Sequence, residues 1–208
     1  MKAEIITCAN RMMEAGLIEG TAGNISVRLG EARVCITPSG VEYGSVTEGD
    51  LPVVDLDGKV IEGNLRPSSE IELHLACYRK FQEVGAVIHS HPIYASMFAS
   101  VGMSIPACLD EFVLYVGGDV SVAAYAPSGS KELAQNSVSR LADRGAVLLA
   151  NHGMVAIAPD LKRAFHITAL VERTAHVAWG ALQLGRVVDV PEAVLSRFGA
   201  VYRRKRLA

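Results

Sequence analysis

The sequence predicts an α/β fold with three layers, α/β/α, whose central sheet is mostly antiparallel or mixed. Helical patterns alternate with short strand-like segments along the whole chain. Several neighbouring strand segments are separated only by tight turns, such as Gly30-Glu31 and Asp57-Gly58, and such turns join antiparallel strands. A doubly wound parallel sheet would instead need a crossover at each step. No segment has the composition of a linker, so we expect a single domain over residues 1–208.

The first half of the chain shows a helical pattern, two hairpin patterns and a second helical pattern. Apolar residues recur with helical spacing in the first and last of these, and they alternate with polar residues in the first hairpin. Ser69 is a suitable N-cap for the second helix, which would place the Glu70 carboxylate in its first turn. We expect helices over 1–17 and 71–81, and strands over 25–29, 32–37, 51–56 and 60–62.

The second half alternates more regularly between strands and helices. Gly117-Gly118 and the loop at 127–130 interrupt the pattern, and 105–109 and 113–116 are short apolar segments. We expect strands over 86–88, 120–125, 146–150 and 155–158, and helices over 93–101, 131–143, 161–184 and 191–204.

Composition and charge exclude several classes of function. The net charge of −2 gives no electrostatic basis for binding nucleic acid or an anionic membrane surface. Charged residues interrupt the first 16 residues, so we expect neither a signal peptide nor a membrane span. The four cysteines form no CxxC pair and are expected to be reduced thiols in a cytoplasmic protein. The basic run 203–206 is expected to be a solvated terminus or a contact with a neighbouring subunit.

Three histidines follow buried strand patterns. His89 and His91 end the segment AVIHSHP with i, i+2 spacing, which puts both imidazoles on one face of a strand. His152 follows the apolar run 146–150 in a similar context. Three imidazoles at strand ends suit a zinc-class ion with one position open for water or substrate, although an HxH pair alone is also a common polar strand end. His74, His166 and His176 lie on helical patterns and are expected to be structural.

Small-residue loops could hold an anion near these histidines. Ser68 and Ser69 precede a helix, whose free N–H groups and dipole favour a phosphate, although ordinary turns and caps have the same composition. Glu70 follows directly and could move a proton during cleavage of a C–C bond. A divalent metal would act as the Lewis acid and stabilise the enediolate, so no Schiff-base lysine is required.

Nine motifs in this order resemble the class II aldolase/adducin family over roughly residues 5–180. They are GNIS at 23–26, ITPSG at 36–40, EGD at 48–50, EGN at 62–64, PSSEIELH at 67–74, VIHSHP at 87–92, IPACLDE at 105–111, APSGSKEL at 126–133 and LLANHG at 148–153. The set is specific for the family and much less specific for the substrate.

The resemblance implies zinc, or another divalent metal such as manganese, on His89, His91 and His152. It implies that Glu70 is the acid/base and a metal ligand while substrate is absent. It implies phosphate contacts from Asn24, Ser39, Gly40, Ser68 and Ser69. The implied enzyme is a metal-dependent aldehyde-lyase that cleaves a ketose 1-phosphate, such as fuculose phosphate or a related deoxy-sugar phosphate, to dihydroxyacetone phosphate and an aldehyde. Family aldolases are usually homotetramers with active sites between subunits.

The second proton donor departs from the family pattern. Family enzymes that act on fuculose phosphate carry one tyrosine after the IPA segment and another near the C-terminus. Tyr202 is the nearest match to the second and is our expected catalytic residue, with Tyr115, Asp110 and Glu111 as alternatives. Because both differences affect the aldehyde end, we expect a related short deoxy-sugar phosphate or broad aldehyde tolerance.

Other functions on the same scaffold stay open. A sugar-phosphate dehydratase, a 4-epimerase or a decarboxylase would use the same metal and phosphate loops, although the epimerase is expected to carry Asp in place of Glu70. A non-catalytic adducin-like module is disfavoured, because such modules have lost metal-site residues that are all present in this chain.

Overall fold

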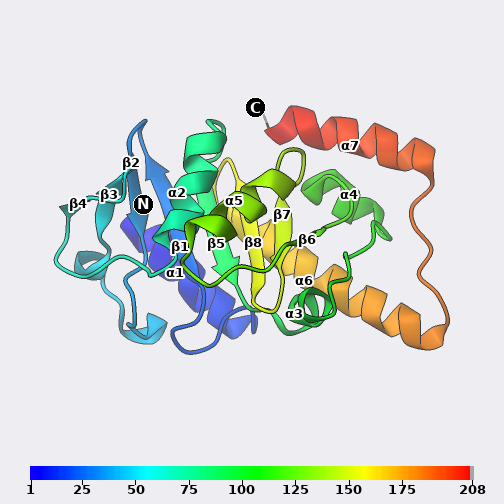
Figure 1. The fold of residues 1–208 in the computed structure, drawn as a ribbon, viewed down its shortest axis with the longest axis horizontal. Coiled ribbons are helices and arrows are strands. Elements are labelled where there is room, and N and C mark those ends of the chain that lie inside the picture. The colour runs from blue at the N-terminus through cyan, green and yellow to red at the C-terminus, as the bar shows by residue number, and fades with distance from the viewer. Residues whose placement is uncertain (207–208) are drawn as a thin grey trace.

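The structure is a computed structural model that describes residues 1–206, and a single eight-stranded sheet runs through them (Figure 1). The strand order is β4-β3-β2-β1-β5-β8-β7-β6, and all neighbours are antiparallel except β6 and β7. The predicted mixed, mostly antiparallel sheet is therefore confirmed. The strands are β1 (Asn24–Leu29), β2 (Arg33–Ile36), β3 (Val53–Asp55), β4 (Val60–Glu62), β5 (Ala86–Ser90), β6 (Val122–Ala123), β7 (Ala146–Leu149) and β8 (Gly153–Ala158).

Helices lie on both faces of this sheet, as predicted. Strand residues alternate between two hydrophobic cores: Ile88 belongs to the core with α1, α3, α4 and α6, whereas the preceding Val87 belongs to the core with α2 and α5. The period of two along each strand thus supplies both cores from the same short segments. The helices are α1 (Lys2–Glu14), α2 (Ile71–Lys80), α3 (Ile93–Ser100), α4 (Asp110–Val116), α5 (Lys131–Arg140), α6 (Leu161–Leu184) and α7 (Glu192–Arg206).

Most predicted boundaries differ from the structure by a few residues, and two of these differences have a clear physical reason. Helix α2 has Glu70, not Ser69, at its N-cap, because Ser68 already turns the chain: its hydroxyl accepts from the Glu70 N–H at 3.2 Å and its carbonyl from the Ile71 N–H at 3.1 Å. The strand expected over 120–125 shortens to β6, since Val120 pairs with Ile105 instead. Neither difference changes the order of the layers.

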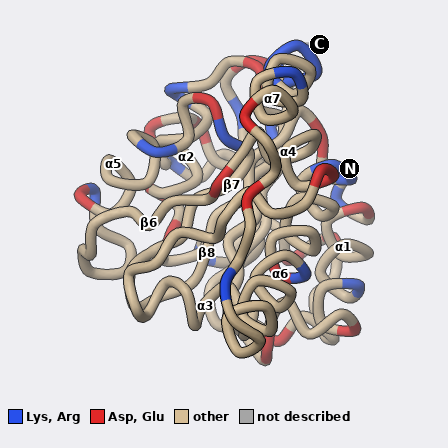
Figure 2. Tube along the Cα trace, turned by 90° about the vertical axis from the view of Figure 1, so that its right-hand side faces the viewer, with Lys and Arg blue, Asp and Glu red and all other residues tan. Residues whose placement is uncertain are grey.

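One residue of the basic C-terminal run is more deeply packed than the sequence predicts, whereas Arg203, Arg204 and Lys205 are exposed as expected. Figure 2 shows positive residues gathered at the end of α7, whereas elsewhere both signs are interspersed along the trace. Arg206 is only 7% exposed, its Nε lies 3.0 Å from Glu83 Oε1, and its Nη1 donates to the Leu141 carbonyl at 2.7 Å. The expectation of a solvated residue is therefore wrong for Arg206. No helix within residues 1–206 is both long and apolar enough to cross a membrane.

Candidate metal and catalytic site

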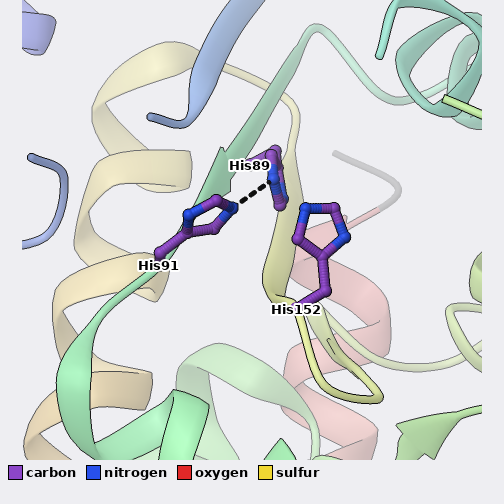
Figure 3. Close-up of side chains that lie close together, drawn as sticks. All are labelled: His89, His91 and His152. Atoms are coloured by element: carbon purple, nitrogen blue, oxygen red, sulfur yellow. Dashed lines mark hydrogen bonds between the residues drawn. The ribbon is translucent and has the colours of Figure 1, made fainter. Parts of the chain in front are cut away.

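The candidate site lies where β1 and β5 meet the turn between β7 and β8. The antiparallel register sets Asn24 of β1 opposite His89 of β5. The turn over 150–152 carries His152 back toward the end of β5. Figure 3 shows the side chains of His89, His91 and His152 pointing toward one another. Their ligand nitrogens all lie within 4.8 Å of one another, so the sequence-predicted histidines do form a group that could hold a metal ion.

The turn that carries His152 depends on two backbone features. Asn151 adopts a left-handed conformation with φ of 55°, which asparagine tolerates better than most residues. Gly153 lies so close to β5 that an added Cβ would collide with the Ser90 carbonyl oxygen and lie 2.6 Å from His91 Cδ2. The glycine after His152 therefore permits the close approach that brings His152 and His91 together.

Hydrogen bonding orients His89 for metal binding. Its Nδ1 lies 2.9 Å from the Met154 carbonyl oxygen, and because a carbonyl can only accept, this nitrogen is the donor. The other ring nitrogen, Nε2, faces the site and lies 2.7 Å from Glu70 Oε2 and 2.8 Å from His91 Nε2. Facing lone pairs repel unless a proton or metal cation lies between them. Three imidazole nitrogens beside one carboxylate are a donor set that zinc or manganese accepts.

The protonation states suit a cation as well. Burial disfavours the charged form of Glu70, but the hydrogen bond and charge of His89, with His152 and Ser128, lower the pKa of Glu70 below its ordinary value. Burial, followed by the charges of His89 and His152, lowers the pKa of His91 to about 4. Burial likewise lowers the pKa of His152. At neutral pH the site therefore presents Glu70 as a carboxylate and His91 and His152 as neutral imidazoles, the forms that ligate divalent ions.

Glu70 is held by side chains from two distant segments. Asn24 Nδ2 donates to Oε2 at 3.3 Å, and Ser128 Oγ donates to Oε1 at 2.8 Å. Ser128 is a site residue that sequence reasoning missed, although its APSG loop was one of the family motifs. The loop lies directly over the serine pair, since a Cβ on Gly129 would be 2.7 Å from the Ser69 carbonyl oxygen.

Two serine-containing loops, at 37–40 and 67–69, lie side by side, and the second leads directly into Glu70. The Ser39 N–H donates to the Arg66 carbonyl at 3.0 Å, and the Ser68 N–H donates to the Thr37 carbonyl at 3.1 Å. Ser39, Gly40 and Ser69 are exposed, whereas Ser68 and Asn24 are buried. All five predicted phosphate contacts thus belong to segments that adjoin the carboxylate, and their contact with phosphate stays a prediction.

The proposed second proton donors are not brought to this group within one chain. Tyr202 is 5% exposed and lies against Gly117 and Gly145, at the start of β7, whereas His152 follows the end of β7. Tyr115 and Tyr202 line a cavity of about 330 Å³ at that far end. Glu111 pairs with Arg173 at 3.2 Å on the surface, and Asp110 is exposed in the first turn of α4. Any role for these four residues at the site stays a prediction.

Comparison with known proteins identifies the family. The family model for the class II aldolase and adducin N-terminal domain matches residues 3–179. The 5-deoxy-D-ribulose 1-phosphate aldolase of Bacillus thuringiensis is 38% identical over 192 residues, which cover 92% of this chain and 90% of that protein. A solved structure titled L-fuculose 1-phosphate aldolase superposes with a TM-score of 0.93 at 37% identity, covering 97% of this chain and 95% of that one.

A further relative is named for a different reaction. The L-ribulose-5-phosphate 4-epimerase of Salmonella paratyphi B is 33% identical over 192 residues, covering 86% of this chain and 84% of that protein. The chain belongs to the class II aldolase and adducin family, and the resemblance inferred from the nine motifs is confirmed. Family membership alone does not select the substrate, because aldolases and an epimerase share it.

Proposed function

We propose that this protein is a metal-dependent aldolase that cleaves a ketose 1-phosphate into dihydroxyacetone phosphate and an aldehyde. The observation that carries the proposal is the convergence of His89, His91, His152 and Glu70 beside two serine-containing loops. The relatives are named for 5-deoxyribulose 1-phosphate and fuculose 1-phosphate, which makes these two sugars the first substrates to test.

Each group has a defined task in this proposal. His89, His91 and His152 would hold Zn²⁺ or Mn²⁺, and when bound the ion would supply Lewis-acid stabilisation of charge on substrate oxygens. Glu70 would exchange the proton that moves when the C–C bond breaks. Asn24, Ser39, Gly40, Ser68 and Ser69 would bind the phosphate, which needs N–H and O–H donors more than positive charge at such a loop.

The principal alternative is an epimerase, favoured by the Salmonella relative. Glu70 argues against it, because we expect an aspartate at this position in the epimerase. Dehydratase or decarboxylase chemistry would use the same ligands, and a non-catalytic adducin-like module is disfavoured by the intact set of three histidines and Glu70.

A coupled cleavage assay tests the proposal directly. Zinc-loaded or manganese-loaded protein would be given the 1-phosphates of fuculose, rhamnulose, ribulose and 5-deoxyribulose, and release of dihydroxyacetone phosphate would be measured. Release that EDTA abolishes supports the aldolase and ranks the aldehyde ends. No release from any of the four sugars, with metal bound, would exclude it and favour the other reactions.

We also propose a cytoplasmic homotetramer. Exposed apolar side chains on α3 and α6, including Ile93, Met97, Val177 and Leu182, support association of like subunits. The four free cysteines fit a reducing compartment. Light scattering coupled to size exclusion should give four times the mass of 22.2 kDa, and a monomer at micromolar concentration would contradict the assembly.

A further inference from the structure

A chain of buried polar side chains runs from Glu70 away from the solvent. Asn24 Oδ1 lies 2.5 Å from His74 Nε2, and His74 Nδ1 lies 2.6 Å from Ser26 Oγ. Ser26 Oγ in turn lies 2.8 Å from the Tyr78 hydroxyl. Asn24 is 6% exposed, and the other three are completely buried. Asn24 is the member of this series that contacts Glu70, and His74, Ser26 and Tyr78 follow it into the interior.

The donor and the acceptor of each of these hydrogen bonds can be assigned one after another, starting from Glu70. An ionised Glu70 only accepts, so the Asn24 amide must turn its NH₂ toward Glu70 and its oxygen toward His74. His74 must then carry its proton on Nε2. Its Nδ1 accepts from the Ser26 hydroxyl, and the Ser26 oxygen accepts from Tyr78. Each side chain in this series therefore has one compatible orientation, and every hydrogen bond between Tyr78 and Glu70 donates in the direction of Glu70.

We propose that His74 is a positioning residue, which as the neutral Nε2–H tautomer fixes the Asn24 amide so that its NH₂ faces Glu70. Two described side-chain contacts of Asn24 distinguish its oxygen from its nitrogen, the one to Glu70 itself and the one to His74, so His74 is the group beyond Glu70 that holds this orientation. A flipped amide would set its oxygen against the Glu70 carboxylate, and two acceptors at that distance repel. The residue expected to be merely structural therefore determines how the acid/base is held.

The burial of His74 supports this role. Burial lowers the pKa of His74 to about 3, with a further lowering by the charge of His89 that Glu70 opposes. The imidazole is therefore neutral across the pH range in which the enzyme would work. A neutral imidazole can donate from Nε2 to Asn24 and accept at Nδ1 from Ser26, as this series of hydrogen bonds requires, whereas an imidazolium would donate from both nitrogens.

Nitrogen NMR of the wild-type protein tests the tautomer without any activity. Long-range ¹H–¹⁵N correlation should show a protonated Nε2 and an unprotonated Nδ1 for His74, unchanged between pH about 5 and about 8. The signal is assigned by its loss in His74→Gln. The opposite tautomer, or an imidazolium in this range, would overturn the proposal.

Kinetics of matched variants test the positioning. His74→Gln retains a donor near the Nε2 position, whereas His74→Leu keeps bulk without one. We expect His74→Leu to lower kcat by about tenfold to a hundredfold, as for one lost hydrogen bond to an oriented charged site, with zinc content and KM little changed. His74→Gln should recover most of that loss. Ser26→Ala should lower kcat less than His74→Leu, because it leaves the imidazole in place.

Two controls separate positioning from folding. Ser137→Ala removes another fully buried hydroxyl, which bonds only the Leu133 carbonyl within its own helix, and should keep wild-type kcat. The double variant Asn24→Ala/His74→Leu should be no slower than Asn24→Ala, because His74 acts through Asn24. Multiplied effects in the double variant, or equal losses in His74→Gln and His74→Leu, would overturn the assignment.

The positioning role of His74 rests on the proposed function, and of its tests only the turnover measurements require aldolase activity. If the wild-type protein cleaves no ketose 1-phosphate, the aldolase proposal fails while the NMR result still decides the tautomer. If cleavage is observed and the tautomer is wrong, the positioning proposal fails alone.

Discussion

Replacement of Glu70 by glutamine separates chemistry from architecture at this site. Glu70→Gln removes the charge and the basic oxygen but keeps the size of the side chain. Its amide oxygen can still accept from Asn24, and its NH₂ can donate to the Ser128 hydroxyl, which is free to rotate and accept. Both hydrogen bonds are therefore retained in exchanged form, so we expect the free energy of unfolding to change by less than about 1 kcal/mol.

Turnover should change far more than stability. A positioned general acid/base contributes on the order of 100-fold or more, which is about 2.7 kcal/mol of activation free energy. Glu70 is 5% exposed and lies within 2.7 Å of His89 Nε2, so bulk water cannot readily take over its task. We therefore expect Glu70→Gln to lose at least about 100-fold in kcat with an unchanged melting profile.

The assay is steady-state release of dihydroxyacetone phosphate, with zinc content and thermal melting measured on the same preparations. Glu72→Gln is the matched control, because this carboxylate lies on the same helix but pairs with Arg79 at the surface. Wild-type turnover in Glu70→Gln would refute the acid/base role. A loss of turnover matched by loss of metal or of folded protein would refute the separation of chemistry from architecture.

Four further perturbations have defined outcomes. Gly153→Ala should lower zinc affinity and cost about 1–3 kcal/mol of stability, because the new Cβ meets His91, whereas Gly180→Ala in open space on α6 should not; equal behaviour in zinc titrations would contradict the close approach. Ser128→Ala removes one donor to Glu70 and should lower kcat by about tenfold at unchanged zinc content, and full activity would show that Ser128 is dispensable. Zinc at about a hundred times its Kd should stabilise the protein by about 2.7 kcal/mol in thermal melts, and EDTA or His152→Ala should remove this gain; a melt insensitive to zinc would exclude a folded-state metal site. Stability of the metal-free protein should fall as the pH drops below 6.5, because unfolded His74 gains a proton that the folded residue, with a pKa of about 3, does not bind; urea titrations should show a shallower fall for His74→Gln, and an unchanged slope would refute the neutral buried histidine.

Local periodicity explains why the strands and helices were predictable. Residues such as Val87 and Ile88 point into different cores, so a buried strand had to be apolar on both faces, and its short length distinguished it from a helix. His89 and His91 were recognisable because they follow such a strand at a spacing that fixes their relative direction. His152 reaches the other two histidines only because β7 and β8 pair with β5. The sequence indicated this histidine because it also follows an apolar run, but no spacing rule placed it beside His89 and His91.

Contacts between distant segments explain what the sequence could not reveal. Ser128 meets Glu70 across 58 residues of sequence, and His74 meets Asn24 across 50. No spacing rule connects such pairs, because their proximity follows from how β1, α2 and the loop before α5 are placed around the sheet. The burial of Arg206 against Glu83 has the same origin, since it requires α7 to return over the domain.

The wrong prediction at the start of α2 supports the role proposed for Glu70 more than the correct boundaries do. Local rules placed Ser69 at the N-cap and used the Glu70 carboxylate to complement the helix dipole. In the structure Glu70 itself is the N-cap residue, yet its side chain makes no capping hydrogen bond and turns instead toward Asn24, Ser128 and His89. Ser68 supplies the turn, so the carboxylate is released from any role in the helix. A residue whose local role is taken over by its neighbour is free to serve the site, and sites are where local rules are expected to fail.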